Sequence, residues 1–156
     1  MPEHTAPFLA LPCVLTITRT FDASRVAVFN AFVDPRQTRR WLGPHGFEMT
    51  YYEADVRPGG AWRGCMRALD DGRELWHGGV YREIVPPERL AFTFAFDLAE
   101  GVRGPETLVT VTLADLGKQT MLTFQQSGFE TPANAEGYRA GWESEFEQLS
   151  AYIARR

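Results

Sequence analysis

The sequence predicts an α+β domain in which one long helix covers a curved antiparallel sheet of six or seven strands. Three observations lead to this fold class. From Phe47 onward, about 80 residues alternate between apolar and polar side chains, which is typical of strands. Two short helical patterns precede this run, and one amphipathic pattern of about 23 residues follows it. Because a sheet with one apolar face needs a covering layer, the last helix is expected to lie across it.

Composition sets the broad class of the protein. A chain of 156 residues suits one domain, and 44% hydrophobic with 23% charged residues are ordinary globular values. A net charge of −4 argues against general nucleic-acid binding, which needs clustered cations. Cys13 and Cys65 are too few for a disulfide framework, although one bridge between them stays open. Neither a membrane span nor a signal peptide is recognisable, so a cytoplasmic protein is expected.

The chain is expected to begin with a loose leader over residues 1–12, which holds three prolines and no periodicity. A single domain then covers residues 13–156. Its first strand is predicted over 13–20, where threonine, valine and isoleucine favour a pleated surface and alternate between two faces.

Two short helices follow the first strand. Asp22 or Ser24 can cap the first, whose apolar face extends over 26–33. The Asp34-Pro35 pair ends that helix and begins the next one, because proline suits the first turn of a helix. A loop rich in glycine and proline ends the second helix.

The strands of the sheet are separated by recognisable turns. Asp70-Asp71-Gly72 is a hairpin signal, since aspartate and glycine tolerate left-handed backbone conformations. The string DVRPGG (55–60) likewise has the chemistry of a turn. A loop is expected over 101–105. The predicted strands are 48–56, 61–69, 75–85, 90–98, 107–113 and 120–126.

The final helix is predicted over 133–155, about 34 Å long, with Thr131 as its N-cap and Pro132 in its first turn. Its apolar residues recur every three or four positions and form one stripe. The stripe consists of Tyr138, Trp142, Phe146, Leu149 and Ile153.

Several strings in this order resemble a known superfamily. They are TRTFDASRVAVFNAFVDP (18–35), RRWLGPHGF (39–47), DVRPGGAWRGCM (55–66), GGVYREIVPPERLAFTF (78–94), and Gly141-Trp142 before EQL (147–149). The chain resembles the helix-grip (SRPBCC) superfamily of START domains, polyketide cyclases and the birch-pollen allergen. It is most similar to the bacterial branch named after the activator of the 90-kDa heat-shock protein ATPase. The resemblance implies a helix packed across a curved sheet around an internal cavity.

Inward-facing aromatic residues are the candidate cavity wall, although a simple packed core is the alternative interpretation. The favoured function is binding of a small hydrophobic or amphipathic molecule there, with Gln126, Arg19, His77 and Tyr138 as polar groups that could orient it. The predicted ligand-cavity residues are Trp41, Trp62, Met66, Trp76, His77, Phe92, Phe94, Phe124, Gln126, Tyr138, Trp142 and Phe146.

Two other functions stay open. One is a co-chaperone-like protein-interaction module, in which the basic cluster of Arg36, Arg39 and Arg40 would contact the partner protein. The other is a cyclase- or hydrolase-type enzyme, with His77, Glu53 and Asp55 as the first suspects. No catalytic residue is assigned. The spacing of the histidines predicts no metal site, no cofactor is expected, and the protein is expected to be a monomer or homodimer.

Overall fold

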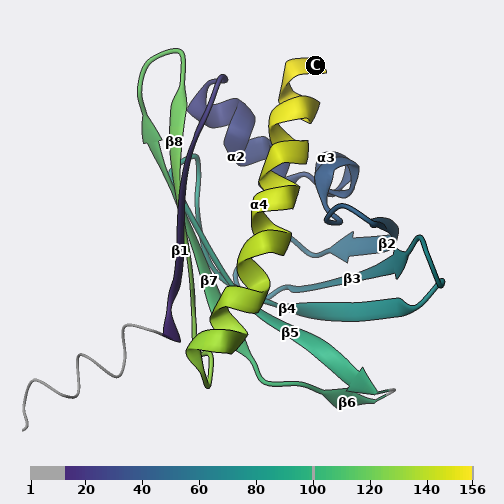
Figure 1. The fold of residues 1–156 in the computed structure, drawn as a ribbon. Coiled ribbons are helices and arrows are strands. Elements are labelled where there is room, and N and C mark those ends of the chain that lie inside the picture. Colours follow the sequence, from purple (N-terminus) through teal and green to yellow (C-terminus); the bar gives the residue numbers. More distant parts are fainter. Residues whose placement is uncertain (1–12, 100, 156) are drawn as a thin grey trace, which may run out of the picture.

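A computed structural model describes residues 13–99 and 101–155, so the predicted leader over 1–12 lies outside the described residues (Figure 1). The two short helices separate the first strand from the remaining ones, and the long helix comes last. The elements are β1 (Leu15–Phe21), α2 (Arg25–Val33), α3 (Pro35–Trp41), β2 (Phe47–Ala54), β3 (Ala61–Ala68), β4 (Glu74–Val85), β5 (Arg89–Ala99), β6 (Val102–Arg103), β7 (Thr107–Asp115), β8 (Thr120–Ser127) and α4 (Pro132–Arg155).

The sheet is antiparallel, with the strand order β1-β8-β7-β5-β4-β3-β2. The short strand β6 pairs with the end of β5, within the stretch predicted as a loop. Figure 1 shows the sheet curling around α4, with α2 and α3 beside the C-terminal part of that helix. The predicted fold class, an antiparallel curved sheet with two short helices and one long C-terminal helix, is therefore confirmed.

Side-chain caps explain where the short helices begin. The Ser24 hydroxyl accepts a hydrogen bond from the backbone N–H of Ala27 at 3.2 Å, which satisfies a donor of the first turn of α2. The Asp34 carboxylate does the same for the N–H of Arg36 at 3.1 Å at the start of α3. The Thr38 hydroxyl bonds back to α2, so the two helices form one bent unit.

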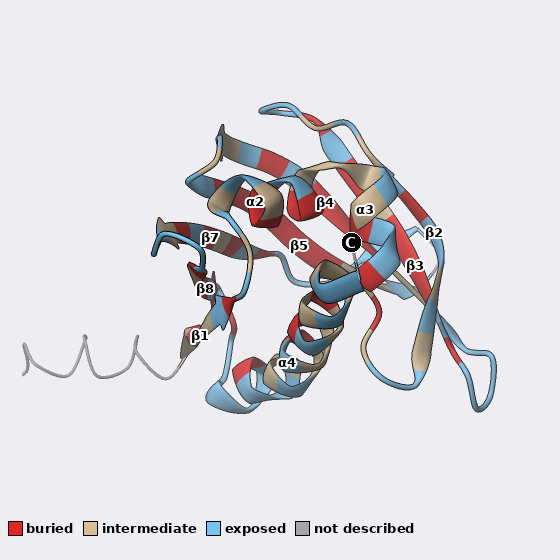
Figure 2. Cartoon of the chain, turned by 90° about the horizontal axis from the view of Figure 1, so that it is seen from above, coloured by how far each residue is buried: buried red, intermediate tan, exposed pale blue. Residues whose placement is uncertain are grey.

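The packed core lies between α4 and the β8 side of the sheet. Trp142 and Phe146 of α4 contact the ring of Phe124, with centroid distances of 4.6 and 5.4 Å. Leu149 continues the same buried stripe. Figure 2 shows buried residues along the strands and on the surfaces of α2 and α4 that face them. One helix cannot cover the whole concave face, so the sheet beyond β5 is left to form a cavity wall.

Within residues 13–99 and 101–155, no helix is both long enough and apolar enough to span a membrane. Cys13 and Cys65 are both free, so the bridge that the sequence left open does not form.

Candidate ligand-binding site

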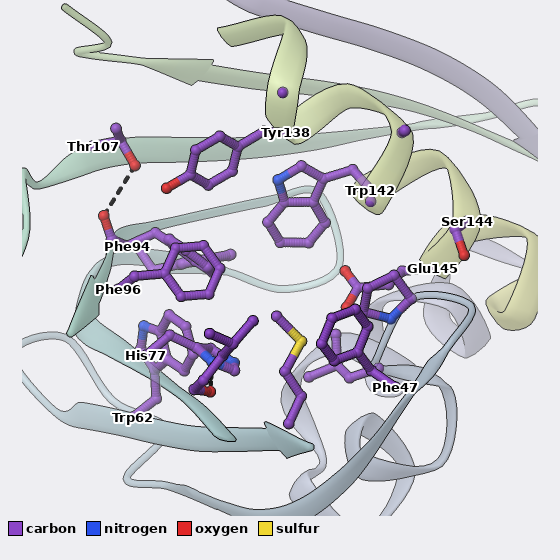
Figure 3. A pocket seen from close by; sticks show the side chains of 18 of the residues that line it. Phe47, Trp62, His77, Phe94, Phe96, Thr107, Tyr138, Trp142, Ser144 and Glu145 are labelled. Atoms are coloured by element: carbon purple, nitrogen blue, oxygen red, sulfur yellow. Dashed lines mark hydrogen bonds between the residues drawn. The ribbon is translucent and has the colours of Figure 1, made fainter. Parts of the chain in front are cut away.

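A cavity of about 830 Å³ lies between the sheet and α4 (Figure 3). Strands β2 to β5 supply one wall, α4 supplies the opposite wall, and α3 with the loop after it closes one end. Eight of the twelve predicted cavity residues line it. These are Trp41, Trp62, Met66, His77, Phe92, Phe94, Tyr138 and Trp142.

The structure places Trp76 outside the cavity. Adjacent residues of a strand point to opposite faces, and the neighbouring His77 points inward. The Trp76 ring lies on the outer face, with the Tyr51 ring at 5.5 Å and the Arg63 guanidinium at 5.1 Å between centres. Placing both Trp76 and His77 in the cavity was therefore inconsistent with strand geometry.

Phe124 and Phe146 are also outside the cavity lining. Both side chains are fully buried and pack against each other and against Trp142, between β8 and α4. They belong to the packed core, because α4 approaches β8 closely enough for rings from both elements to interdigitate. Their rings hold the helix on the sheet at the edge of the cavity.

Gln126 is a structural group and does not line the cavity. Its side chain is fully buried, accepts a hydrogen bond from the Trp142 indole N–H at 2.9 Å and donates one to the Thr107 hydroxyl at 2.9 Å. Thr107 in turn donates to the carbonyl oxygen of Phe94 at 3.0 Å. This chain of bonds orients the Trp142 ring beside the cavity. Arg19, the other polar candidate on this side, is also outside the lining.

The indole N–H groups of Trp41 and Trp62 in the cavity wall donate to backbone carbonyl oxygens and are not free to bind a ligand. The Trp41 N–H donates to the carbonyl of Ala31 at 2.9 Å, and the Trp62 N–H donates to the carbonyl of Thr93 at 3.1 Å. The close approach of β4 and β5 here requires glycine, because a Cβ at Gly79 would lie 1.9 Å from the Thr93 oxygen. The wall thus presents mainly the carbon surfaces of its rings.

His77 lines the cavity and is buried, at 5% exposed. Its ring stacks on Phe94 at 5.5 Å, and Nδ1 lies 3.2 Å from the carbonyl oxygen of Leu75. Burial lowers the pKa of His77 to about 4, so the ring is neutral at pH 7. A histidine with this pKa is a weak proton acceptor at neutral pH.

Glu145 is a titratable cavity residue that sequence reasoning missed. Figure 3 shows its carboxyl group directed from α4 into the cavity. Oε2 accepts a hydrogen bond from the N–H of Gly43 at 2.8 Å, and burial raises the pKa of Glu145 to about 8. Its spacing was the available signal: a residue three after Trp142 and four after Gly141 shares their side of a helix.

The two strand carboxylates suspected of acid–base chemistry do not reach the cavity. Glu53 and Asp55 are exposed and absent from its lining. Asp55 forms an ion pair with Arg57 at 2.9 Å. At the end of β2, Glu53 points to the outer face because its neighbour Tyr52 faces the cavity, and Asp55 lies just beyond the strand.

The basic residues of α3 do not act as one patch. Arg36 pairs with Asp34 at 3.4 Å, and Arg39 donates to the carbonyl oxygen of Tyr52 at 2.8 Å. Arg40 is exposed. Two of the three arginines are therefore engaged with their own chain.

Comparison with known proteins agrees with this architecture. The sequence model of the family described as Activator of Hsp90 ATPase homolog 1-like protein matches residues 22–154. A solved structure from Chromobacterium violaceum is 33% identical, with a TM-score of 0.79 over 88% of this chain and 95% of that chain. One from Rhizobium leguminosarum is 27% identical, with a TM-score of 0.77 over 92% and 95%. One from Silicibacter pomeroyi shares the fold at 23% identity, with a TM-score of 0.82 over 90% and 97%. A search of curated proteins finds no match.

Proposed function

The chain belongs to the activator of Hsp90 ATPase homolog 1-like family, and we propose that it binds a small apolar or amphipathic molecule between the sheet and α4. The observation that carries the proposal is a cavity of about 830 Å³ walled by rings whose indole N–H groups are bonded into the protein. Pockets of this size and polarity are typical of small-molecule sites.

Burial of the ligand's apolar surface can by itself provide the binding free energy, without an ion pair. A ligand that buries roughly 300 Å² of apolar surface gains about 7 kcal/mol, before the costs of association are subtracted. The rings of Trp62, Phe94 and Trp142 are already held by their neighbours, at centroid distances of 5.5 Å for Trp62–Phe94 and 5.9 Å for Phe94–Trp142. Little ordering is therefore required of the wall on binding.

The proposal is tested with Nile red, a neutral apolar dye, and with native mass spectrometry of the freshly purified protein. We expect the dye to bind with a blue-shifted emission and to quench the tryptophans of the wall. Gly141→Phe should abolish binding, because a Cβ at Gly141 meets no atom within 4 Å and the added ring would enter the cavity.

Glu143→Phe is the matched control, since Glu143 is exposed on the same helix and absent from the cavity lining. It should bind the dye as the wild type does. The proposal fails if the wild type binds no dye and carries no copurified ligand. It also fails if Gly141→Phe and Glu143→Phe bind the dye equally well.

The contacts of the described residues favour the cavity over the α3 arginines as the functional site. A co-chaperone-like interaction through Arg36 and Arg39 would first have to break the contacts of these residues with Asp34 and with the carbonyl of Tyr52. The family name supports the co-chaperone-like alternative, but no contact among the described residues supports it.

A further inference from the structure

The ionisable groups that line the cavity are mainly acidic. Its described lining contains no lysine or arginine, and it contains two carboxyl side chains, Glu130 and Glu145. Of its two histidines, His77 is neutral at pH 7 because burial lowers its pKa to about 4. The other, His45, lies 3.3 Å from the carboxylate of Glu147. An anionic ligand would therefore find no cation of the wall free to neutralise it.

Glu145 is held rigidly at this wall. The loop after α3 is attached to α4 by three hydrogen bonds, from Gly43 N–H to Glu145, from His45 N–H to the Ser144 hydroxyl, and from the Gln148 amide to the carbonyl of Gly43. The first bond uses Oε2 of Glu145. Within the part of the chain that the structure describes, Oε1 has no hydrogen-bond donor, and it is not sealed from the cavity.

We propose that the ligand is an apolar amine, whose ammonium group pairs with the Glu145 carboxylate while its hydrocarbon part lies among the aromatic rings. This inference rests on the proposed function and names its ligand class. A half-buried carboxylate among apolar rings is costly without a cation, and a charge-assisted hydrogen bond to an ammonium group offsets that cost. The ring faces of Trp142 and Phe47, which line the same cavity, add a surface suited to a cation.

The state of Glu145 without ligand supports the assignment. Its pKa is raised to about 8 by burial, and among residues 13–99 and 101–155 the Gly43 N–H is the group that lowers it. The protein thus builds a preorganised carboxyl group into an apolar space without supplying a positive side chain for it. Glu143, in contrast, is exposed on the same helix and absent from the cavity lining, so it serves as the comparison.

A matched ligand series tests the inference: 4-phenylbutylamine, 4-phenylbutan-1-ol and 4-phenylbutanoate, each titrated by tryptophan quenching and by competition with Nile red. The titrations are made at pH 9, above the pKa of about 8 of Glu145 and below that of an alkyl ammonium group, about 10.4, so that both partners of the pair are charged. We expect the amine to bind about tenfold more tightly than the alcohol, and the carboxylate to bind most weakly. Glu145→Gln should weaken amine binding about tenfold and leave the alcohol within about threefold, because the amide keeps an acceptor but loses the charge. Glu143→Gln, at an exposed position of the same helix that is absent from the cavity lining, should leave both affinities unchanged.

The outcomes separate the two proposals. If Nile red and the alcohol bind but the amine gains nothing, or if Glu145→Gln leaves the preference for the amine intact, the amine assignment is wrong and the cavity proposal survives. If neither the series nor the dye binds, the cavity proposal itself fails. Unchanged alcohol binding by Glu145→Gln shows that this variant is folded.

Discussion

Replacing Glu145 with glutamine should stabilise the protein, and by more at high pH than at low pH. The pKa of Glu145 is about 8 in the folded protein against an ordinary value of 4.5, because burial penalises the charged form. Below about pH 4.5 the side chain is protonated in both the folded and the unfolded chain, so it costs nothing. As the pH rises from 4.5 to 8 the unfolded chain is ionised while the folded protein keeps its proton, so stability is lost over this range and the loss is complete above pH 8.

The size of the effect follows from the two pKa values. One unit of difference corresponds to about 1.4 kcal/mol, so the upper limit above pH 8 is about 5 kcal/mol. The Oε1 atom faces a cavity that solvent enters, which reduces the cost, and we expect about 2 kcal/mol. Glutamine keeps the shape and an oxygen that can accept the Gly43 N–H bond, so packing is preserved.

Urea unfolding of the wild type and Glu145→Gln at pH 5 and pH 9 measures this directly. The free-energy gap between the two proteins should widen by about 2 kcal/mol between these pH values. Glu130→Gln, which changes an exposed carboxylate of the same cavity, should show a constant gap. A gap for Glu145→Gln that stays constant within about 0.5 kcal/mol would refute the reasoning that Glu145 is destabilised by burial.

Three further predictions concern stability. His77 should contribute a loss of up to about 3 kcal/mol as the pH falls from 6.5 to 4, because the unfolded chain protonates it and the folded protein does not. Because Glu145 acts in the opposite direction over part of this range, the free-energy gap between the wild type and His77→Phe is the measurement; it should differ by about 2 kcal/mol between urea titrations at pH 7 and pH 4.5, and an unchanged gap would contradict the prediction. Gly79→Ala should cost more than about 3 kcal/mol, seen as a lower Tm, because its Cβ would meet the Thr93 carbonyl oxygen; a Tm within a few degrees of wild type would contradict this. Gly137→Ala should raise stability by about 1 kcal/mol in urea unfolding, because it improves helix propensity and its Cβ meets no atom within 4 Å; a loss would show that this space is occupied.

The order of elements was predictable because each depends on local chemistry. The caps at Ser24 and Asp34 and the proline at 35 place the short helices within a residue or two of where they lie. The stripe containing Trp142, Phe146 and Leu149 predicted both the last helix and its buried face. The cavity-facing side of β5 was equally readable, because its large apolar residues stand at every second position; Leu90, Phe92, Phe94 and Phe96 all line the cavity.

The division between cavity and core was not predictable from periodicity. Phe94 and Phe124 both face inward from the same sheet, yet Phe94 lines the cavity and Phe124 is covered by α4. Periodicity identifies a face, whereas the distance between that face and the helix depends on the curl of the whole sheet. The structural role of Gln126 was not predictable for the same reason, because its hydrogen-bond partners Thr107 and Trp142 are 19 and 16 residues away in the chain.

The sequence by itself thus determined most of the elements and most of their faces, since these follow from caps, turns and alternation within a few residues of one another. The family was indicated separately, by the resemblance of several strings in their order along the chain. Only the tertiary structure decided that Glu145 enters the cavity and that His77 is neutral. Both depend on how much protein encloses a side chain, a quantity to which distant segments such as the loop at Gly43 and strand β5 contribute.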